Sequence, residues 1–174
     1  MRQARTSPGL RPFLKTDAPR LAALARASIE TLTEDCYDVD QRAAWSARFD
    51  DAGALTKRLS DELALVAVLK GEIVGFAALK GGADMDMLYV APHFARQGVG
   101  SALADALEKL AAARGAKEIS VGASDAAREF FLRRGYSARS RNVVQVDGEW
   151  LGNTVMTKKL AGSEIRPDAP ERLQ

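Results

Sequence analysis

Residues 88–101, LYVAPHFARQGVGS, lead from an apolar strand-like run into a helix across a turn that contains two glycines. The first N–H groups of a helix have no acceptor within it, and the positive end of the helix dipole lies beside them. Gly98 and Gly100 let an anion approach these groups without a Cβ in the way. The stretch therefore predicts a phosphate site, or else a plain loop whose glycines only ease the bend.

The turn does not fit two common phosphate-binding motifs. No Lys-Ser or Lys-Thr pair follows the second glycine at the distance that a Walker loop requires. The preceding strand belongs to an antiparallel meander, whereas a dinucleotide fingerprint needs a βαβ unit.

The segments on either side of this turn predict a mixed sheet flanked by helices. Apolar residues with a period of two predict strands at 10–14, 63–69, 73–79, 84–90, 118–121, 142–146 and 150–158. A period of 3.6 predicts helices at 98–114 and 125–134, at 40–48 with a loose continuation to 59, and at 17–33, where Asp17 can cap the first turn.

Length and composition favour one globular domain. The chain has 174 residues, of which 47% are hydrophobic and 28% charged, so it can bury a sizeable core. Segments 1–9 and 161–174 are polar and are expected to be loose ends around a domain at 10–160.

Charge and cysteine content narrow the function classes. A net charge of +2 makes no strong electrostatic case for nucleic acid or a membrane surface. A single cysteine, Cys36, forms no internal disulfide and suits a reducing compartment. No apolar run is long enough to span a bilayer, and residues 1–10 lack the apolar stretch of a secretion signal, so a cytoplasmic protein is expected.

Two spaced motifs resemble the GNAT superfamily of N-acetyltransferases. LYVxP at 88–92 followed by RQGVG at 96–100 is similar to the acyl-CoA-binding motif of that family, and AxxFFxxxGY at 127–136 is similar to its second motif. With DMLYV at 86–90 and GxWxxNxxM at 148–156, the chain resembles the YafP-like bacterial branch. The resemblance implies an α/β fold with a central mixed, mostly antiparallel sheet of six to seven strands and a bulge in the fourth.

The same resemblance implies acetyl-CoA as acyl donor and no metal. The implied cofactor contacts are Leu88, Tyr89 and Val90 on the strand, the turn residues Arg96, Gln97, Gly98, Val99, Gly100 and Ser101, and Ser124, Ala127, Phe130 and Phe131 near the second motif. The chain departs from the family pattern at two positions. Ala95 stands where many members have Gln or Arg, and Phe131 aligns with the tyrosine that protonates the departing thiolate.

Transfer of an acetyl group to an amine requires an uncharged amine, a polarised thioester carbonyl and a tolerable thiolate leaving group. If the side chains alternate without interruption, Asp84 and Asp86 share a strand face with Leu88 and Val90. A carboxylate against an apolar face has a raised pKa, which favours Asp86 as general base. The alternative is that Asp86 faces solvent past the bulge or only orients a neighbour.

Tyr37, in a loop between two predicted helices, is the candidate general acid. A thiolate can also leave with little help, because the pKa of a thiol is near 8.5. Trp150 is expected either in the core or, with Asn153, in the acceptor pocket.

We therefore expect an N-acetyltransferase that moves the acetyl group of acetyl-CoA to a primary amine of a small molecule or peptide, by direct attack in a ternary complex. Two alternatives remain open: a non-catalytic acyl-CoA-binding or sensing module, which Phe131 in place of tyrosine allows, and an acetylating toxin-type enzyme acting on charged tRNA, which requires a basic face. A homodimer is also left open.

Overall fold

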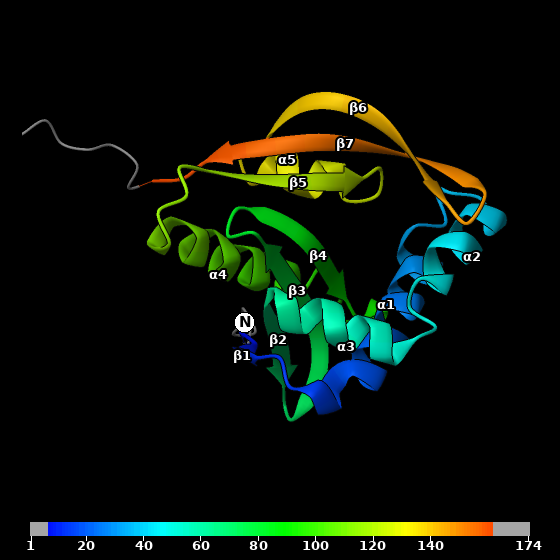
Figure 1. Cartoon of the computed structure of the whole chain (residues 1–174), viewed down its shortest axis with the longest axis horizontal. Coiled ribbons are helices and arrows are strands. Elements are labelled where there is room, and N and C mark those ends of the chain that lie inside the picture. The colour runs from blue at the N-terminus through cyan, green and yellow to red at the C-terminus, as the bar shows by residue number, and fades with distance from the viewer. Residues whose placement is uncertain (1–6, 162–174) are drawn as a thin grey trace, which may run out of the picture.

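Seven strands form a single sheet in the order β1-β2-β3-β4-β5-β7-β6 in the computed structural model, which describes residues 7–161 (Figure 1). Every neighbouring pair is antiparallel except β4 and β5, which are parallel. The strands are β1 Gly9–Pro12, β2 Leu63–Leu69, β3 Glu72–Lys80, β4 Asp84–Val90, β5 Glu118–Ser124, β6 Ser137–Val146 and β7 Glu149–Lys159. The predicted mixed, mostly antiparallel sheet is confirmed. The loose ends expected at 1–9 and 161–174 lie almost entirely outside the described residues.

Helices cover both faces of this sheet. They are α1 Ala18–Leu32, α2 Val39–Ala47, α3 Ala52–Asp61, α4 Val99–Ala113 and α5 Arg128–Arg133, with single 3-10 turns η1 Lys15–Asp17 and η2 Pro92–Phe94. Apolar side chains of α1 and α3 pack on one face, and those of α4 and α5 pack on the other. No helix within residues 7–161 is long and apolar enough to cross a membrane.

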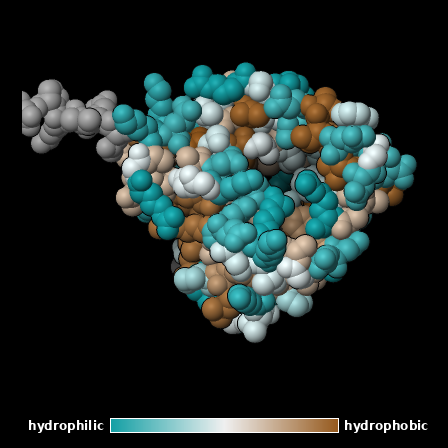
Figure 2. Space-filling view, viewed as in Figure 1, coloured by the Kyte–Doolittle hydropathy of each residue, from teal (hydrophilic) through white to brown (hydrophobic). Residues whose placement is uncertain are grey.

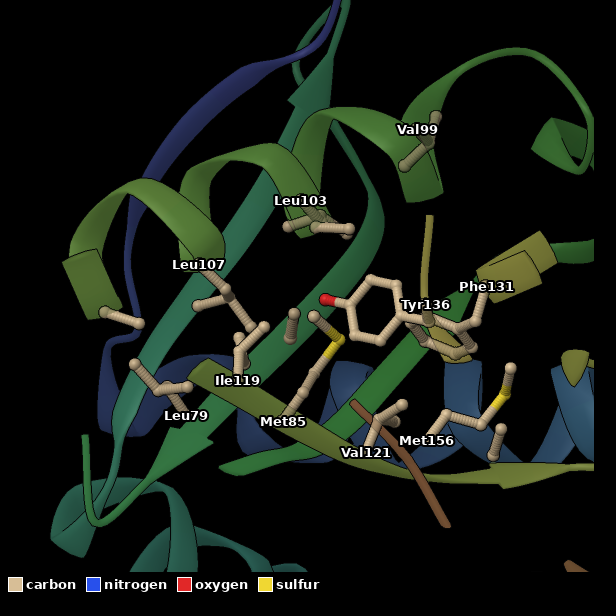
Figure 3. Close-up of a cluster of buried hydrophobic side chains, with 14 of the residues drawn as sticks. Leu79, Met85, Val99, Leu103, Leu107, Ile119, Val121, Phe131, Tyr136 and Met156 are labelled. Atoms are coloured by element: carbon tan, nitrogen blue, oxygen red, sulfur yellow. The ribbon is translucent and has the colours of Figure 1, made fainter. Parts of the chain in front are cut away.

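The core beneath α4 fixes the position of that helix. Leu103 and Leu107 of α4 are fully buried and lie over Met85 of β4, Ile119 of β5 and Met156 of β7 (Figure 3). A buried leucine or isoleucine contributes about 1.5–3 kcal/mol relative to an exposed one, so these contacts hold α4 firmly against the middle of the sheet. The N-terminus of α4 is therefore held at a defined place beside β4.

Two local features differ from the sequence-based expectation. The helical region expected over 40–59 is two helices, because the Asp51 side chain accepts a hydrogen bond from the Ala54 N–H at 3.0 Å and begins a new helix there. Asp17 does not cap α1 through its side chain. Its carboxylate instead binds Arg11 at 2.7 and 2.8 Å and the Leu14 N–H at 2.8 Å.

A bulge in β4 separates this strand from β5. Consecutive β3 residues Ala78 and Leu79 pair with Met87 and Met85, which leaves Asp86 as the extra residue. β4 pairs with β5 only from Asp84 to Met85, and beyond that point β4 curves away from β5 (Figure 1). The expected bulge is confirmed, and the parting of the strands leaves one edge of β4 without a neighbouring strand.

Gly75 of β3 tests how closely α4 is packed. A Cβ at this position would lie 2.9 Å from Val99 Cγ1, 3.0 Å from the Tyr89 carbonyl oxygen and 3.1 Å from Leu103 Cδ1. Gly75→Ala should therefore lower the free energy of unfolding by about 1–3 kcal/mol, measured by urea denaturation. Gly9→Ala, in β1, is the matched control, because its Cβ would meet only the Val68 carbonyl oxygen at 3.7 Å. Equal stability of the two variants would contradict this account of the packing.

Candidate active site

The glycine turn ends in a helix N-terminus with free donors. Gly98 has φ 91°, a conformation that favours glycine, and it directly precedes α4. The first backbone bond at this end runs from the Ala102 N–H to the Gly98 carbonyl oxygen at 3.0 Å. The N–H groups of Val99, Gly100 and Ser101 precede this bond and have no acceptor within the helix. The turn thus presents a concentrated set of donors, as an anion site requires.

This N-terminus lies where β4 and α5 meet. A Cβ on Gly100 would lie 3.6 Å from the Phe130 ring of α5 and 3.6 Å from Val90 Cγ2 of β4. Leu88 and Val90 pack on the α4 side of the sheet, as expected for residues beside the turn. Gln97 donates from Nε2 to the His93 carbonyl oxygen at 2.8 Å, which ties the turn to η2.

The two phenylalanines of α5 have different surroundings. Phe130 is partly buried beside the turn, and Phe131 is only 2% exposed. The Phe131 ring makes edge contacts with Phe130 and Tyr136, each at a centroid distance of 5.0 Å, inside the core under α4 (Figure 3). The start of α5 turns the Phe131 side chain into the core, and its expected contact with the cofactor stays a prediction.

A cavity of about 290 Å³ opens beside the separated strands. It lies between β4, the end of β5, the α2–α3 region and the β6–β7 hairpin, where Figure 2 shows the surface hollowed. Its polar and aromatic lining consists of Tyr37, Trp45, Arg48, Phe49, Arg58, Asp84, Asp86, Tyr89, Ser124 and Asn153. The cavity therefore combines aromatic side chains with two carboxylates and two guanidinium groups.

Asp86 points toward α3. Its Oδ2 accepts hydrogen bonds from Arg58 Nε at 2.9 Å and Nη2 at 2.5 Å. The bulge breaks the alternation, so that Met85 packs under α4 and Met87 packs against α1 and α3. The expectation that Asp86 shares a face with Leu88 and Val90 is therefore wrong, although Asp86 does line the cavity. Asp84 lines the same cavity and accepts a hydrogen bond from Ser120 Oγ at 3.0 Å.

The sequence analysis missed Arg58, which lines the cavity, and Glu62, which lies beside Arg58 outside the lining. Arg58 Nε lies 3.8 Å from Glu62 Oε1, and the Glu62 side chain is only 6% exposed. Burial, together with the neighbouring Asp86 carboxylate, raises the pKa of Glu62 to about 7. No local pattern marks these residues, because their relation to Asp86 depends on α3 packing beside β4.

Tyr37 lies in the loop between α1 and α2, as expected, and its side chain is buried. Its hydroxyl donates to the Gly152 carbonyl oxygen at 2.6 Å and accepts from the Asp125 N–H at 2.8 Å. Burial raises the pKa of the phenol above its ordinary value. The hydroxyl therefore joins β7 to the segment after β5 at one wall of the cavity.

Tyr89 and Trp45 form a second fixed wall. Trp45 Nε1 donates to Tyr89 Oη at 3.1 Å, and burial raises the pKa of Tyr89 to about 12. The Tyr89 ring thus faces the cavity side, opposite Leu88 and Val90. Asn153 also lines the cavity, and its Oδ1 is buried without a hydrogen-bond partner. Trp150 is 59% exposed and belongs neither to the core nor to the cavity lining.

A more open hollow of about 470 Å³ lies along β6 and contains several arginines. Arg141 in this hollow binds both carboxylate oxygens of Asp125, and Arg139 donates to Thr157 Oγ1 at 2.7 Å. Its charges are largely engaged by neighbours, and it is lined by no residue of β4 or α4. Within residues 7–161, no group of three His, Cys, Asp or Glu side chains could hold a metal ion.

Residues 30–160 match the family model described as an acetyltransferase (GNAT) domain. An Escherichia coli (strain K12) protein described as "Uncharacterized N-acetyltransferase YafP" is 29% identical over 150 residues, which cover 86% of this chain and 95% of that protein.

Solved structures show the same similarity. A Rhodopseudomonas palustris structure titled "GCN5-Related N-acetyltransferase: Aminotransferase, Class-II" is 51% identical, with a TM-score of 0.89, and the match covers 92% of this chain and 100% of that one. The PaiA N-acetyltransferase from Thermoplasma acidophilum, solved in complex with coenzyme A, has the same fold at 19% identity, with a TM-score of 0.69 and coverage of 88% and 99%.

Proposed function

This chain belongs to the GNAT family of acetyltransferases, and on that premise we propose that it transfers the acetyl group of acetyl-CoA to a primary amine of a small molecule or peptide. The observation that carries the proposal is the separation of β4 and β5. β4 thereby places Val90 beside the donor-rich end of α4 and Asp86 in the lining of the cavity. The Thermoplasma acidophilum protein of the same fold was solved with coenzyme A, which supports the same ligand here.

Acetyl-CoA would lie along the unpaired edge of β4. Its pyrophosphate is held by the N–H groups of Gly98 to Ser101, with Arg96 and Gln97 at the mouth of the turn. Its pantetheine amides bond to the backbone of Leu88, Tyr89 and Val90, which β5 no longer reaches. Ser124, Ala127 and Phe130 line the opposite side, because α5 begins beside the turn. Val99 and Gly100 contribute through their backbone, since the Val99 side chain is buried in the core.

The acceptor amine would enter the aromatic cavity as an ammonium ion. The faces of Tyr37, Trp45 and Tyr89 attract a cation, and Asp86 supplies a carboxylate at the wall nearest β4. Asp86 takes one proton from the ammonium nitrogen, and the neutral amine attacks the thioester carbonyl carbon. Backbone N–H groups at the parted strands stabilise the negative oxygen of the tetrahedral intermediate. Collapse of this intermediate breaks the C–S bond, and the nitrogen releases its second proton to solvent, which leaves the neutral amide.

Tyr37 is the proposed donor of a proton to the departing thiolate. Phe131 has no proton to give and lies in the core, whereas the Tyr37 hydroxyl lies at the cavity wall. In the absence of substrate its proton is donated to Gly152, and rotation about the C–O bond can redirect it. The raised pKa of Tyr37 means that the phenol carries its proton throughout the neutral range.

The net charge of +2 and the single cysteine support a cytoplasmic enzyme and do not favour a tRNA-linked acceptor.

A non-catalytic binding module is the alternative function. An enzyme should release coenzyme A from acetyl-CoA when an amine is present, whereas a binding module should release none. A homodimer stays a prediction, which sedimentation would test.

Gly98→Asp should weaken binding of acetyl-CoA by far more than tenfold, measured by titration calorimetry. The new carboxylate would lie against the phosphates, where it repels them and fills the space above the N–H groups. Gly115→Asp is the matched control at the other end of α4. Its φ of 92° is nearly the same as the 91° of Gly98, and neither Cβ would meet an atom within 4 Å. If both variants lost affinity equally, the cause would be backbone strain at the substituted glycine and not repulsion of the phosphates.

Asp86→Asn should lower kcat about a hundredfold or more and leave acetyl-CoA affinity nearly unchanged, because the amide keeps the shape and cannot take a proton. The loss should shrink from pH 6 to pH 10, since an alkylamine with a pKa near 10 becomes neutral without a base. Asp84→Asn, which alters a second carboxylate in the same cavity, should cost much less. Parallel rate profiles with a small offset would show that Asp86 is not the base.

Tyr37→Phe should lower kcat about tenfold while the affinity for acetyl-CoA stays the same, because only the transferable proton is removed. Tyr136→Phe is the control: its hydroxyl donates to Glu108 Oε1 at 3.0 Å in the core under α4, away from the cavity. Tyr37→Phe loses the hydrogen bonds to Gly152 and Asp125, and Tyr136→Phe loses the one to Glu108, so a stability effect should appear in both. A similar fall of kcat in both variants would exclude Tyr37 as the acid.

A further inference from the structure

Glu62 is a buried carboxyl group that the proposed reaction does not yet use. It follows the last residue of α3 and precedes β2, and only 6% of its side chain is exposed. Its Oε2 is buried and has no hydrogen-bond partner. A carboxylate in such a place is costly unless a partner compensates it or the group holds a proton. The site must therefore provide a counter-charge or keep the carboxyl neutral.

The available counter-charge is Arg58, which also serves Asp86. Arg58 Nε is 3.8 Å from Glu62 Oε1 and 2.9 Å from Asp86 Oδ2. Its Nη2 is only 2.5 Å from Asp86 Oδ2, so the guanidinium is bound mainly to Asp86. One cation thus stands between two carboxyl groups, of which Asp86 lines the cavity and Glu62 does not.

The charged groups that face Glu62 come from three elements. Burial and Asp86 of β4 raise the pKa of Glu62 to about 7, while Arg58 of α3 and Lys80 of β3 act in the opposite direction. Near neutral pH the group therefore changes between its acid and its carboxylate. Because Glu62 and Asp86 lie beside the same guanidinium, the protonation of one affects the other.

We propose, on the basis of the proposed function, that Glu62 is a positioning residue that decides how completely Arg58 neutralises Asp86. When Glu62 holds its proton, Arg58 is committed to Asp86 and the three groups carry no net charge. When Glu62 loses that proton to solvent, two carboxylates share one guanidinium and the group carries one negative charge. The cavity wall then attracts an ammonium ion more strongly, and Asp86 is freer to accept its proton.

The pH dependence of kcat/KM in Glu62→Gln tests this role. Glutamine keeps the size of the acid form and cannot ionise, so the variant should remain in the low-activity state. At pH 6 its kcat/KM should lie within about twofold of wild type, and at pH 8.5 it should be about tenfold lower. Asp61→Asn, at the exposed neighbouring residue, removes the same formal charge and should follow wild type at every pH. An equal loss in Glu62→Gln at all pH values would overturn the proposal.

A second measurement does not depend on any substrate. A carboxyl whose pKa is about 7 in the folded protein, against 4.5 for the free side chain, binds its proton more tightly when folded. Its contribution to stability is present below the unfolded value and is lost as pH rises through 7. The midpoint of thermal unfolding of wild type should therefore fall relative to Glu62→Gln between pH 5 and pH 8. A constant difference between the two proteins would overturn the proposal.

The two tests distinguish failure of this inference from failure of the proposed function. Suppose that wild type transfers no acetyl group to any amine, while its stability changes with pH relative to Glu62→Gln. The proposed function is then wrong, and so is the proposed role of Glu62 in acetyl transfer. If wild type is active and the two proteins differ equally at all pH values in both measurements, only the inference about Glu62 is wrong.

Discussion

The extra residue in β4 is the constraint on which the rest of this structure depends. Asp86, inserted between Met85 and Met87, bends β4, and the pairing of β4 with β5 stops after two residues. The backbone groups released by this separation must find other partners, because unpaired buried amides are costly. In the proposed function, the amide groups of acetyl-CoA would satisfy this requirement, and the bulge would thereby couple a local irregularity to cofactor binding.

The same bulge places an anion-binding helix N-terminus and a carboxylate on opposite faces of β4. On one face, α4 is held by Leu103 and Leu107 over the middle of the sheet, which sets its free N–H groups beside the end of β4. On the other face, the reversal of side-chain direction turns Asp86 toward α3 and the aromatic cavity. Anion-binding donors and a carboxylate are kept apart by the strand itself, so neither neutralises the other.

On the cavity side, the charged side chains do not form one-to-one ion pairs, because one guanidinium faces two carboxyl groups. Arg58 faces both Asp86 and Glu62, and the cost of burying a second carboxylate appears as a pKa of about 7 for Glu62. With a pKa of about 7 for Glu62, this group of charges is expected to change its net charge near neutral pH. Such a response suits a site whose substrate must lose a proton before it reacts.

The sequence by itself determined the strand, turn and helix around residues 88–101, because glycine conformation, helix-end donors and hydrophobic period are all local properties of the chain. It also predicted the bulge in β4, through a resemblance rather than through periodicity. Only the tertiary structure decided where Asp86, Phe131 and Tyr37 point. A single inserted residue reverses every later side chain of a strand, and the start of a short helix selects which of two adjacent rings enters the core. The proposed role of Glu62 is not visible in the sequence, since its pKa arises from burial and from charges on three elements that only folding brings together.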